Sequence, residues 1–353
     1  MSATLRPVAG EVSELLELLR PWVSKGGEPI VIRTSGSSGQ PKDVVLSHRA
    51  VLASATATHN RLGGPGQWLL ALPPTGVAGL QVLVRSILAE ETPVLASEHE
   101  TLADAIGAMT GPRQYASLVP TQLHRLDASG DLSVLACLDT LLIGGAAVSP
   151  ILLSRARDAG VNVVRTYGMS ETCGGCVYDG RPLDGVRIRI GDDRQIHLAG
   201  PILFDGYGLD SYGLDGYGVA GETDKVLKDG WFATADLGEL NPDGSLRVLG
   251  RADDVVISGG VNVSLPAVTV VLRDIEGVAD AYAVAVEDPE WGQRVVGCLV
   301  GDIALHIVRD AVEAAGLPRT WGPRQLLILD AMPLLPGGKV DRLQLQERAR
   351  GPR

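Results

Sequence analysis

Short hydrophobic runs alternate with longer amphipathic stretches along the first half of the chain. Runs rich in Val, Leu and Ile predict strands at residues 29–33, 68–72, 93–96, 116–119, 140–144 and 161–166. The stretches between them predict helices at residues 46–62, 79–90, 101–109 and 150–160. Regular alternation of strands and helices is typical of a layered α/β fold with parallel strands.

The two ends of the chain have different patterns. Near the N-terminus, Leu15, Leu18, Leu19 and Trp22 fall on one face of a predicted amphipathic helix, whose end Pro21 should limit. After Gly168, short β-like pieces and Gly/Asp turns predict a β-rich subdomain up to about residue 250. Within it, residues 206–218 read GYGLDSYGLDGYG, which predicts a solvated loop or, alternatively, a functional lid.

A second domain is expected at the C-terminus. Helices are predicted at residues 264–277 and 304–316, and strands at 279–288, 294–302 and 324–332. Some hundred residues can fold independently. We therefore expect a large N-terminal α/β domain with a β-rich subdomain over residues 1–252. A small α+β domain should follow over residues 253–353.

Composition excludes several classes of protein. The 353 residues carry 31 basic and 42 acidic side chains, a net charge of -11, so a nucleic-acid partner is not expected. No apolar run approaches the ~18 residues of a membrane span, and the N-terminus lacks a signal-peptide pattern. The 4 cysteines are too few for a disulfide framework and indicate a cytoplasmic protein.

The strongest chemical motif is TSGSSGQPK, residues 34–42. It joins Thr34, Ser35, Gly36, Ser37, Ser38 and Gly39 to Lys42, after a predicted strand and before a helical run. Backbone N–H groups and hydroxyls in such a loop can bind phosphate, and the lysine adds a positive charge. The spacing differs from the P-loop of nucleotide hydrolases.

Four weaker motifs follow in order. TYGMSET, residues 166–172, contains Glu171, a carboxylate suited to Mg²⁺ beside phosphates. GWFATADLGEL contains Asp236, which could accept both ribose hydroxyls. GRADDVVISGGVN lies at the domain transition, and LPGGKVDR places Lys339 after two glycines.

Together, the five motifs resemble the adenylate-forming superfamily, which includes acyl- and aryl-CoA synthetases, adenylation domains of peptide synthetases and luciferases. The resemblance covers about residues 30–345. It implies that a carboxylate attacks the α-phosphate of Mg·ATP to give acyl-AMP and pyrophosphate. A thiol, here of coenzyme A, then displaces AMP.

The resemblance also assigns roles to residues. It implies a phosphate loop at 34–42, an adenine and acyl side at Gly144, Gly145 and Ala146, and a small domain that rotates about Asp253. The catalytic residues would be Lys339, Lys42 and Glu171, which also binds the metal. The remaining nucleotide contacts would come from Tyr167, Gly168, Ser170, Asp236 and Arg251, with Ser258, Gly259 and Gly260 on the CoA side.

Within the superfamily, residues 167–186 and the SGGVN loop most resemble the o-succinylbenzoate–CoA ligases of menaquinone biosynthesis. Two positions depart from the usual pattern: Gly76 replaces a histidine of the acyl pocket, and Thr269 replaces a glutamate of the small domain. The substrate of these relatives carries two carboxylates, so the pocket should offer a donor to the non-reacting one. Arg85 is the candidate, with a surface arginine as the alternative, and Met169 is expected at the same pocket.

Other functions stay open at this stage. The chain could load a carrier protein instead of CoA, or it could be a degenerate, non-catalytic nucleotide-binding protein. Cys173 and Cys176 form C-G-G-C, but a redox or zinc site would need a thioredoxin-like context or a second cysteine pair. His48 is expected to be a structural residue at a helix start. The sequence leaves self-association into a homo-oligomer open.

Overall fold

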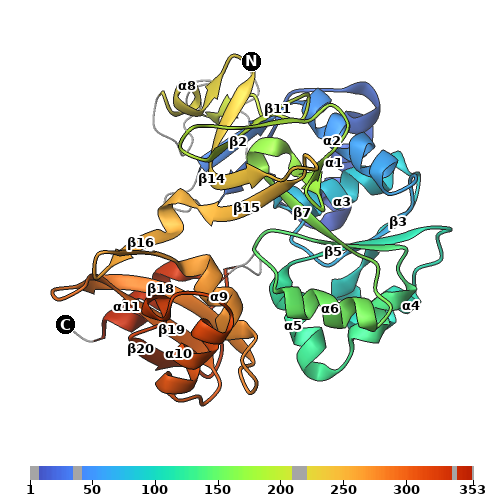
Figure 1. Ribbon diagram of the computed structural model, residues 1–353. Helices are drawn as coiled ribbons and strands as arrows, with labels where there is room; N and C mark the ends of the chain where they lie inside the picture. Colours follow the sequence, from blue (N-terminus) through green and yellow to red (C-terminus); the bar gives the residue numbers. More distant parts are fainter. Residues whose placement is uncertain (1–7, 35–41, 209–220, 336–339, 352–353) are drawn as a thin grey trace.

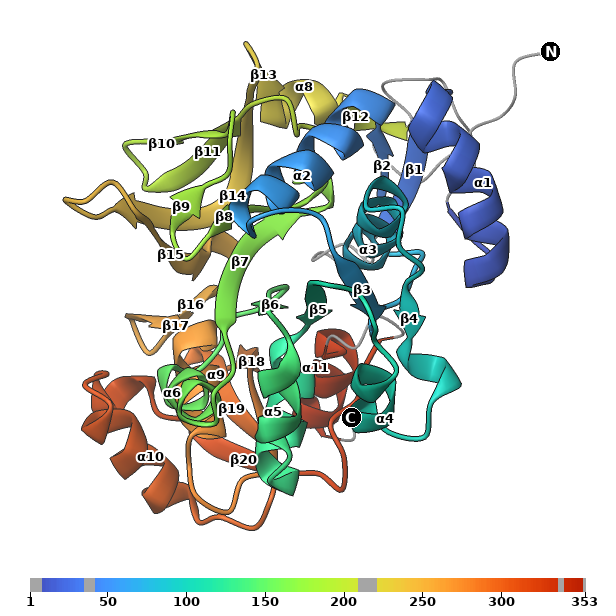
Figure 2. The ribbon, with the colours of Figure 1, turned by 90° about the vertical axis from the view of Figure 1, so that its right-hand side faces the viewer.

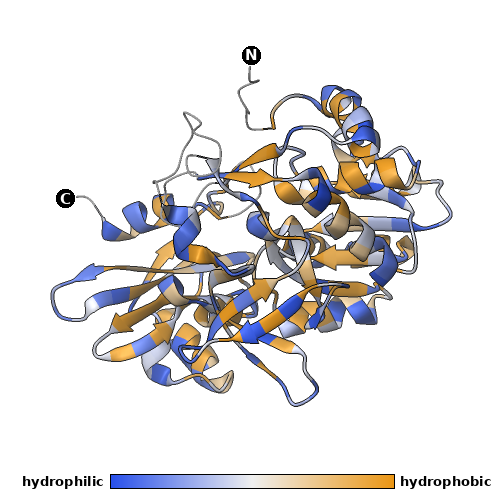
Figure 3. Cartoon of the chain, turned by 90° about the horizontal axis from the view of Figure 1, so that it is seen from above, coloured by the Kyte–Doolittle hydropathy of each residue, from blue (hydrophilic) through white to orange (hydrophobic). Residues whose placement is uncertain are grey.

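The computed structural model describes residues 8–34, 42–208, 221–335 and 340–351. Within these residues the strands form four sheets, of three, five, five and seven strands. Figure 1 shows the C-terminal sheet, with α9, α10 and α11, as a separate unit at the lower left, below β14 and β15. Hydrophobic residues concentrate on the strands, whereas the connecting loops are mainly hydrophilic (Figure 3).

The seven-stranded sheet has the order β4-β3-β5-β6-β7-β8-β9. Its first five strands are parallel, as predicted, and β8 and β9 continue it in antiparallel fashion. Every residue of β3 and β6 is buried, as expected for parallel strands covered on both faces. The strands are β3 (Gln67–Leu70), β4 (Val94–Leu95), β5 (Gln114–Leu118), β6 (Thr140–Ile143), β7 (Val163–Met169), β8 (Gly174–Tyr178) and β9 (Arg181–Pro182).

Helices cover both faces of this sheet (Figure 2). Along β3, Trp68 and Leu70 pack into the core on one face, while Leu69 packs into the core on the other. The first face carries α1 (Val12–Lys25), α2 (His48–Arg61) and α3 (Val77–Leu88). The second carries α4 (Leu102–Gly107), α5 (Pro120–Ser129) and α6 (Pro150–Asp158).

The N-terminal helix differs from its prediction in two respects. Pro21 lies inside α1 and does not end it, and Leu18 is 56% exposed. The helix continues to Lys25 because Trp22 and Val23, beyond the proline, are buried against the core. Burial of these two side chains offsets the hydrogen bond that proline cannot donate.

The first predicted strand does not belong to the parallel sheet. Residues of β1 (Ile30–Thr34) pair antiparallel with β2 (Lys42–Leu46), and β12 (Gly206–Tyr207) extends this small sheet. The strand before the loop and the helix after it are confirmed, but strand β2 between the loop and α2 was not predicted. The hydrophobic run of β2 is short and merges with α2 in the sequence, so only the pairing with β1 separates them.

The β-rich subdomain forms an antiparallel sheet in the order β10-β11-β14-β13, and β15 also pairs with β14. Residues 206–207 are a strand, so the predicted loop over residues 206–218 was wrong at its start; residues 209–218 lie outside the described residues. The elements are β10 (Arg187–Ile190), β11 (Gln195–Ala199), α8 (Glu222–Val226), β13 (Leu227–Lys228), β14 (Trp231–Leu240) and β15 (Leu246–Arg251).

The C-terminal unit is a mixed sheet in the order β17-β16-β19-β18, and β20 pairs parallel with β19. One hydrophobic core includes residues of α9 and α10, and a second includes residues of α11. A boundary at residue 253 stays a prediction. The elements are β16 (Val255–Ser258), β17 (Val261–Ser264), α9 (Leu265–Arg273), β18 (Asp280–Asp288), β19 (Gly292–Val300), α10 (Leu305–Ala314), β20 (Gln325–Ile328) and α11 (Arg342–Arg350).

Short 3-10 turns complete the described elements: η1 (Ala96–Glu98), η2 (Leu132–Cys137), η3 (Ser170–Thr172), η4 (Ala252–Asp254) and η5 (Arg319–Trp321). None of the described helices combines the length and hydrophobicity needed to cross a membrane.

Candidate active site

The predicted phosphate loop joins the two strands of the β1–β2 hairpin. Thr34 and Lys42 are paired at the loop end of this hairpin, and the Thr34 hydroxyl donates to the Lys42 carbonyl at 3.2 Å. Ser35, Gly36, Ser37, Ser38 and Gly39 lie outside the described residues. The hairpin thus fixes both ends of the loop and places the Lys42 side chain beside β12.

Lys42 has two partners that the sequence did not reveal. Its Nζ lies 3.1 Å from Glu222 Oε2 and 4.7 Å from the centre of the Tyr207 ring. The ion pair is only partly shielded, because the Lys42 and Glu222 side chains are 30% and 23% exposed. Hydrogen bonds from Lys225 and Lys42 lower the pKa of Glu222. Glu222 therefore places a negative charge beside the positive charge of Lys42.

Tyr207 also reaches the predicted metal ligand. Its hydroxyl donates to Glu171 Oε1 at 2.9 Å, and Glu171 lies in η3, directly after β7. Burial, followed by the Glu171 charge, raises the pKa of Tyr207, which therefore stays a neutral donor. Tyr207 thus brings Lys42 and Glu171 to one place.

The predicted ribose residues come together at Tyr167, at the other end of the segment 167–171 that contains Glu171. The Tyr167 hydroxyl donates to Asp236 Oδ2 at 2.7 Å, and Asp236 Oδ1 lies 3.7 Å from Arg251 Nη1. Asp236 and Arg251 are directly opposite each other on β14 and β15. Residues 167–171 therefore contact both the Asp236 group and the Tyr207 group.

Asp236 is a carboxylate that the protein buries. Burial raises its pKa, while the Tyr167 hydrogen bond and the Arg251 charge lower it. Burial and the nearby Asp236 charge together raise the pKa of Tyr167. The phenol therefore remains protonated and donates to the carboxylate.

Gly144, directly after β6, lies too close to β7 to carry a side chain. A Cβ on Gly144 would lie 2.2 Å from Thr166 Oγ1. Gly145 and Ala146, just beyond, are exposed, while Tyr167, Gly168, Met169 and Ser170 are partly buried. These residues lie at the carboxyl end of the parallel strands, where α/β sheets usually bind ligands.

The predicted hinge lies in η4 and has charged contacts on both sides. Arg251 Nε donates to Asp253 Oδ1 at 2.8 Å, and Arg251 Nη2 donates to Asp253 Oδ2 at 3.2 Å. The next residue, Asp254, is buried and forms an ion pair with Arg342 of α11 at 2.5 Å. The C-terminal unit also contacts the N-cap of α6, because the hydroxyl of the capping Ser149 donates to Asp274. Asp253 as hinge stays a prediction.

The predicted CoA-side residues form the turn between β16 and β17. Gly259 and Gly260 have φ of +57° and +78°, which suits a two-residue hairpin turn and favours glycine at both positions. Ser258 is buried. Lys339 lies outside the described residues, so its predicted role is untested by the geometry.

Arg85 is buried inside the large domain. It is 3% exposed, which excludes the surface alternative, and its guanidinium carbon lies 4.6 Å from the centre of the Trp68 ring. Its Nε and Nη1 have no hydrogen-bond partner in the described part of the chain. Burial lowers the pKa of Arg85.

Several other sequence features have structural roles. Cys173 and Cys176 are buried free thiols whose pKa values burial raises, that of Cys176 to about 12, which disfavours a reactive thiolate. His48 is the first residue of α2, within hydrogen-bond distance of the Val23 carbonyl at 3.1 Å.

The two positions that depart from the family pattern are built into secondary structure. Gly76 is the residue that precedes α3. The Thr269 hydroxyl donates to the Leu265 carbonyl at 2.8 Å and accepts from Ala283 N–H at 2.9 Å. Thr269 therefore ties α9 to β18 within the C-terminal unit.

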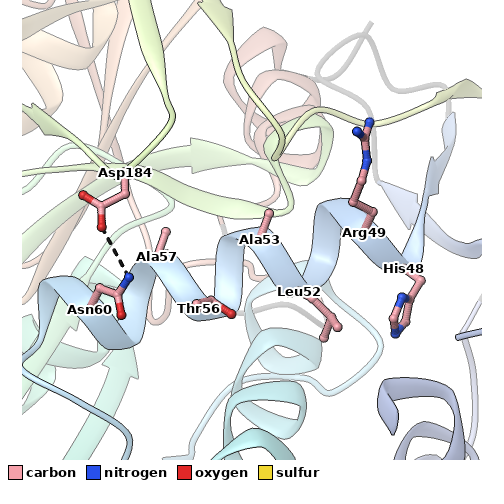
Figure 4. A pocket seen from close by; sticks show the side chains of 8 residues that line it. All are labelled: His48, Arg49, Leu52, Ala53, Thr56, Ala57, Asn60 and Asp184. Atoms are coloured by element: carbon pink, nitrogen blue, oxygen red, sulfur yellow. Dashed lines mark hydrogen bonds between the residues drawn. The ribbon is translucent and has the colours of Figure 1, made fainter. Parts of the chain in front are cut away.

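A separate hollow of about 500 Å³ runs along the outer side of α2 (Figure 4). Asn60 Nδ2 donates to Asp184 across it at 3.4 Å. Its lining shares no residue with the site described above. The residues are His48, Arg49, Leu52, Ala53, Thr56, Ala57, Asn60 and Asp184.

Residues 23–209 match the family described as AMP-binding enzyme. A relative described as probable 2-succinylbenzoate–CoA ligase, from Mycobacterium tuberculosis, is 41% identical over 91% of this chain and 85% of its own.

Two solved structures are similar to this chain. One is an o-succinylbenzoate CoA synthetase from Bacillus subtilis in complex with the acyl-adenylate intermediate OSB-AMP. It has a TM-score of 0.76 and 28% identity, over 90% of this chain and 68% of that one. A second structure of the Bacillus subtilis synthetase, with ATP and magnesium ion, has a TM-score of 0.74 and 27% identity over 90% and 69%.

The family match spans the phosphate-loop hairpin, Arg85 and the Tyr167–Glu171 segment, and the relatives extend the similarity over β14, β15 and the C-terminal unit. The chain therefore belongs to the AMP-binding enzyme family.

Proposed function

We propose that this protein is an ATP-dependent o-succinylbenzoate–CoA ligase of menaquinone biosynthesis. The observation that carries the proposal is the 41% identity, over 91% of the chain, to a protein described as a probable 2-succinylbenzoate–CoA ligase. The geometry supports it, because the predicted phosphate and ribose residues converge on the segment 167–171. The substrates are then the acid, ATP with Mg²⁺, and coenzyme A.

In the first half-reaction, an oxygen of the substrate carboxylate attacks the α-phosphorus of ATP and pyrophosphate leaves. The acid supplies the nucleophile, so the protein has only to position the reactants and neutralise charge. We assign the phosphates to the 34–42 loop and Lys42, and the ribose to Asp236, with Arg251 beside it. Lys339 would bridge the carboxylate and the α-phosphate.

Glu171 fits a magnesium site completed by the nucleotide. The described residues contain no group of three or more His, Cys, Asp or Glu side chains that could hold a metal ion. Mg²⁺ commonly uses one or two carboxylates together with substrate phosphates and water. When bound, the ion would neutralise phosphate charge, while Tyr207 orients the Glu171 carboxylate through its hydroxyl.

In the second half-reaction, the thiol sulfur of CoA attacks the acyl carbon and AMP leaves. We propose that the C-terminal domain, residues 253–353, rotates about Asp253 between the two steps. The Ser258–Gly260 turn would then approach the thiol. The Arg251–Asp253 and Asp254–Arg342 contacts on either side of the hinge support this assignment.

Arg85 is our candidate for the non-reacting carboxylate of the substrate. The support is its burial without a hydrogen-bond partner for Nε and Nη1 among the described residues, a costly state that a bound anion would relieve. Arg85→Gln should raise the KM for o-succinylbenzoate. An unchanged KM would remove Arg85 from the pocket.

The first experiment is ATP–pyrophosphate exchange with a panel of carboxylic acids. Exchange that depends on o-succinylbenzoate supports the ligase, whereas no exchange with any acid favours a non-catalytic nucleotide-binding protein.

We also infer a cytoplasmic location, because ATP and CoA are cytoplasmic substrates and the four cysteines are free.

A further inference from the structure

Tyr207 contacts two candidate site residues, although it lies outside the five sequence motifs. Its side chain is buried, with 4% of its surface exposed. Its hydroxyl donates to Glu171 Oε1 at 2.9 Å, and Lys42 Nζ lies 4.7 Å from the centre of its ring. One buried phenol therefore contacts both the carboxylate and the ammonium group of this part of the site.

The backbone of Tyr207 is held on two sides. Its strand, β12, pairs antiparallel with β2, and Tyr207 lies opposite Val44 (Figure 2). Its N–H donates to Thr223 Oγ1 at 2.9 Å, so α8 contacts it as well. These contacts fix the point from which the phenol extends towards Glu171.

Aromatic packing fixes the ring. The centres of the Phe204 and Tyr207 rings are 5.1 Å apart, and Phe204 packs in turn against Phe232 at 5.2 Å. Phe204 also holds the metal-ligand candidate, because its N–H donates to the Glu171 carbonyl at 3.0 Å. The segment 204–207 therefore contacts Glu171 at two points, one on its backbone and one on its carboxylate.

Tyr207 binds only one of the two carboxylate oxygens of Glu171. Among the residues that the structure describes, no other side chain forms a hydrogen bond with this carboxylate. Oε1 accepts from the phenol, so Oε2 is the oxygen left for a cation. A metal ion that used both oxygens would have to displace the Tyr207 hydroxyl or share Oε1 with it.

Mg²⁺ and Ca²⁺ differ in how they use carboxylates. Mg²⁺ requires near-ideal octahedral geometry and is usually bound through one or two carboxylates together with phosphates and water. Ca²⁺ is larger, accepts more oxygen ligands and often takes both oxygens of one carboxylate. A carboxylate with one oxygen already hydrogen-bonded therefore suits Mg²⁺ better than Ca²⁺.

We propose that Tyr207 is a positioning residue that makes Glu171 a single-oxygen ligand and thereby selects Mg²⁺ over Ca²⁺ in the nucleotide complex. This inference rests on the proposed function, because it takes Glu171 as a ligand of the metal that accompanies ATP. It goes further by assigning the choice of metal to the hydroxyl of Tyr207.

The test is Tyr207→Phe, which removes the hydroxyl but keeps the ring beside Lys42. Calorimetry on the full chain, without acid or CoA, measures the dissociation constant of ATP at saturating Mg²⁺ and again at saturating Ca²⁺. The constant with Ca²⁺ divided by that with Mg²⁺ gives the metal preference. Tyr115→Phe is the matched control, because Tyr115 is also buried and its hydroxyl donates to the carbonyls of Leu62 and Gly64 at 3.1 Å.

Wild-type protein should bind ATP more tightly with Mg²⁺ than with Ca²⁺. Tyr207→Phe should lower this preference about tenfold, mainly through weaker binding with Mg²⁺, because a hydrogen bond to a charged group is lost. Tyr115→Phe should keep the wild-type preference. In a Glu171→Gln background, Tyr207→Phe should have no further effect on the preference, because Tyr207 acts through that carboxylate.

A wild type without a preference for Mg²⁺, or an unchanged preference in Tyr207→Phe, would overturn the inference. Equal weakening of ATP binding with both cations would show a packing role and would also overturn it, as would an effect that persists in the Glu171→Gln background. If the wild type does not bind ATP with either cation, the proposed function and this inference fall together. Exchange of pyrophosphate that depends on o-succinylbenzoate, with no effect of Tyr207→Phe on the preference, overturns this inference alone.

Discussion

Asp236 is a buried carboxylate held between the Tyr167 hydroxyl and the Arg251 guanidinium. Asp236→Ala should weaken ATP binding by roughly 1.5–3 kcal/mol, because the ribose loses a charged acceptor. The dissociation constant for ATP, measured by calorimetry, checks this. Asp243→Ala is the control, since Asp243 pairs with Arg181 at the exposed end of the same sheet. An ATP affinity equal to wild type in Asp236→Ala would refute the ribose role.

Lys42 and Glu222 form an ion pair at 3.1 Å. If Lys42 binds phosphate as proposed, Glu222 should compete with phosphate for it. Glu222→Gln should lower the KM for ATP about two- to fivefold, since partly exposed ion pairs are weak and easily replaced. Asp224→Asn, on the same short helix, should leave this KM at the wild-type value. A higher KM in Glu222→Gln would instead mean that Glu222 supports the phosphate site.

His59 predicts a pH dependence of stability. Its folded pKa, about 4, lies below the ordinary value of 6.5, because burial and Arg85 disfavour the charged ring. Between these two values the unfolded chain binds a proton that the folded chain does not, so stability falls as pH falls below about 6.5. Urea unfolding at pH 5 should show roughly 1–2 kcal/mol less loss, relative to pH 7, in His59→Leu than in wild type. Identical losses in the two proteins would contradict the lowered pKa.

The sequence predicted single residues of the candidate site but not the contacts between them. Lys42, Glu171 and Asp236 lie in local motifs with recognisable order. Tyr207, which joins Lys42 to Glu171, belongs to a segment with three similar tyrosines, and only its pairing with β2 distinguishes it. Glu222 is 180 positions from Lys42, so local periodicity holds no information about their contact.

Among the elements, the parallel strands were the easiest to predict and the hairpin at the phosphate loop was the hardest. Hydrophobic runs such as residues 140–144 are buried on both faces, so their pattern is unambiguous. In contrast, β2 runs almost directly into α2, and a hydrophobic stretch that contains both follows neither period. Pro21 was misread for a related reason, because tertiary packing beyond it outweighs its local effect.

The proposed hinge at Asp253 can be tested by fixing its backbone. Asp253→Pro should block rotation of the C-terminal domain, because proline fixes φ within η4. One half-reaction should survive and the other should collapse. ATP–pyrophosphate exchange and thioester formation from synthetic acyl-AMP measure them separately. Asp253→Ala is the control for loss of the Arg251 contact. Equal loss of both half-reactions in Asp253→Pro alone would place the hinge elsewhere.

For the whole molecule, we propose that the two half-reactions use two arrangements of the same domains. Lys339→Ala should slow adenylation by about 10²–10³-fold, because one preorganised donor to the developing charge is lost. Thioester formation from synthetic acyl-AMP should stay near wild type, because the proposed rotation removes Lys339 before the thiol enters. Equal loss of both steps would contradict the rotation even if the lysine matters.

The central claim is that this chain joins o-succinylbenzoate to CoA. The most direct measurement supplies purified protein with Mg·ATP, a panel of mono- and dicarboxylic acids, and either CoA or a carrier protein, and quantifies the acyl thioester, AMP and pyrophosphate. We predict the highest kcat/KM for o-succinylbenzoate, with equal amounts of acyl-CoA, AMP and pyrophosphate and no transfer to the carrier protein. Preferential ligation of another acid, or acyl transfer to the carrier protein without acyl-CoA, would contradict the account.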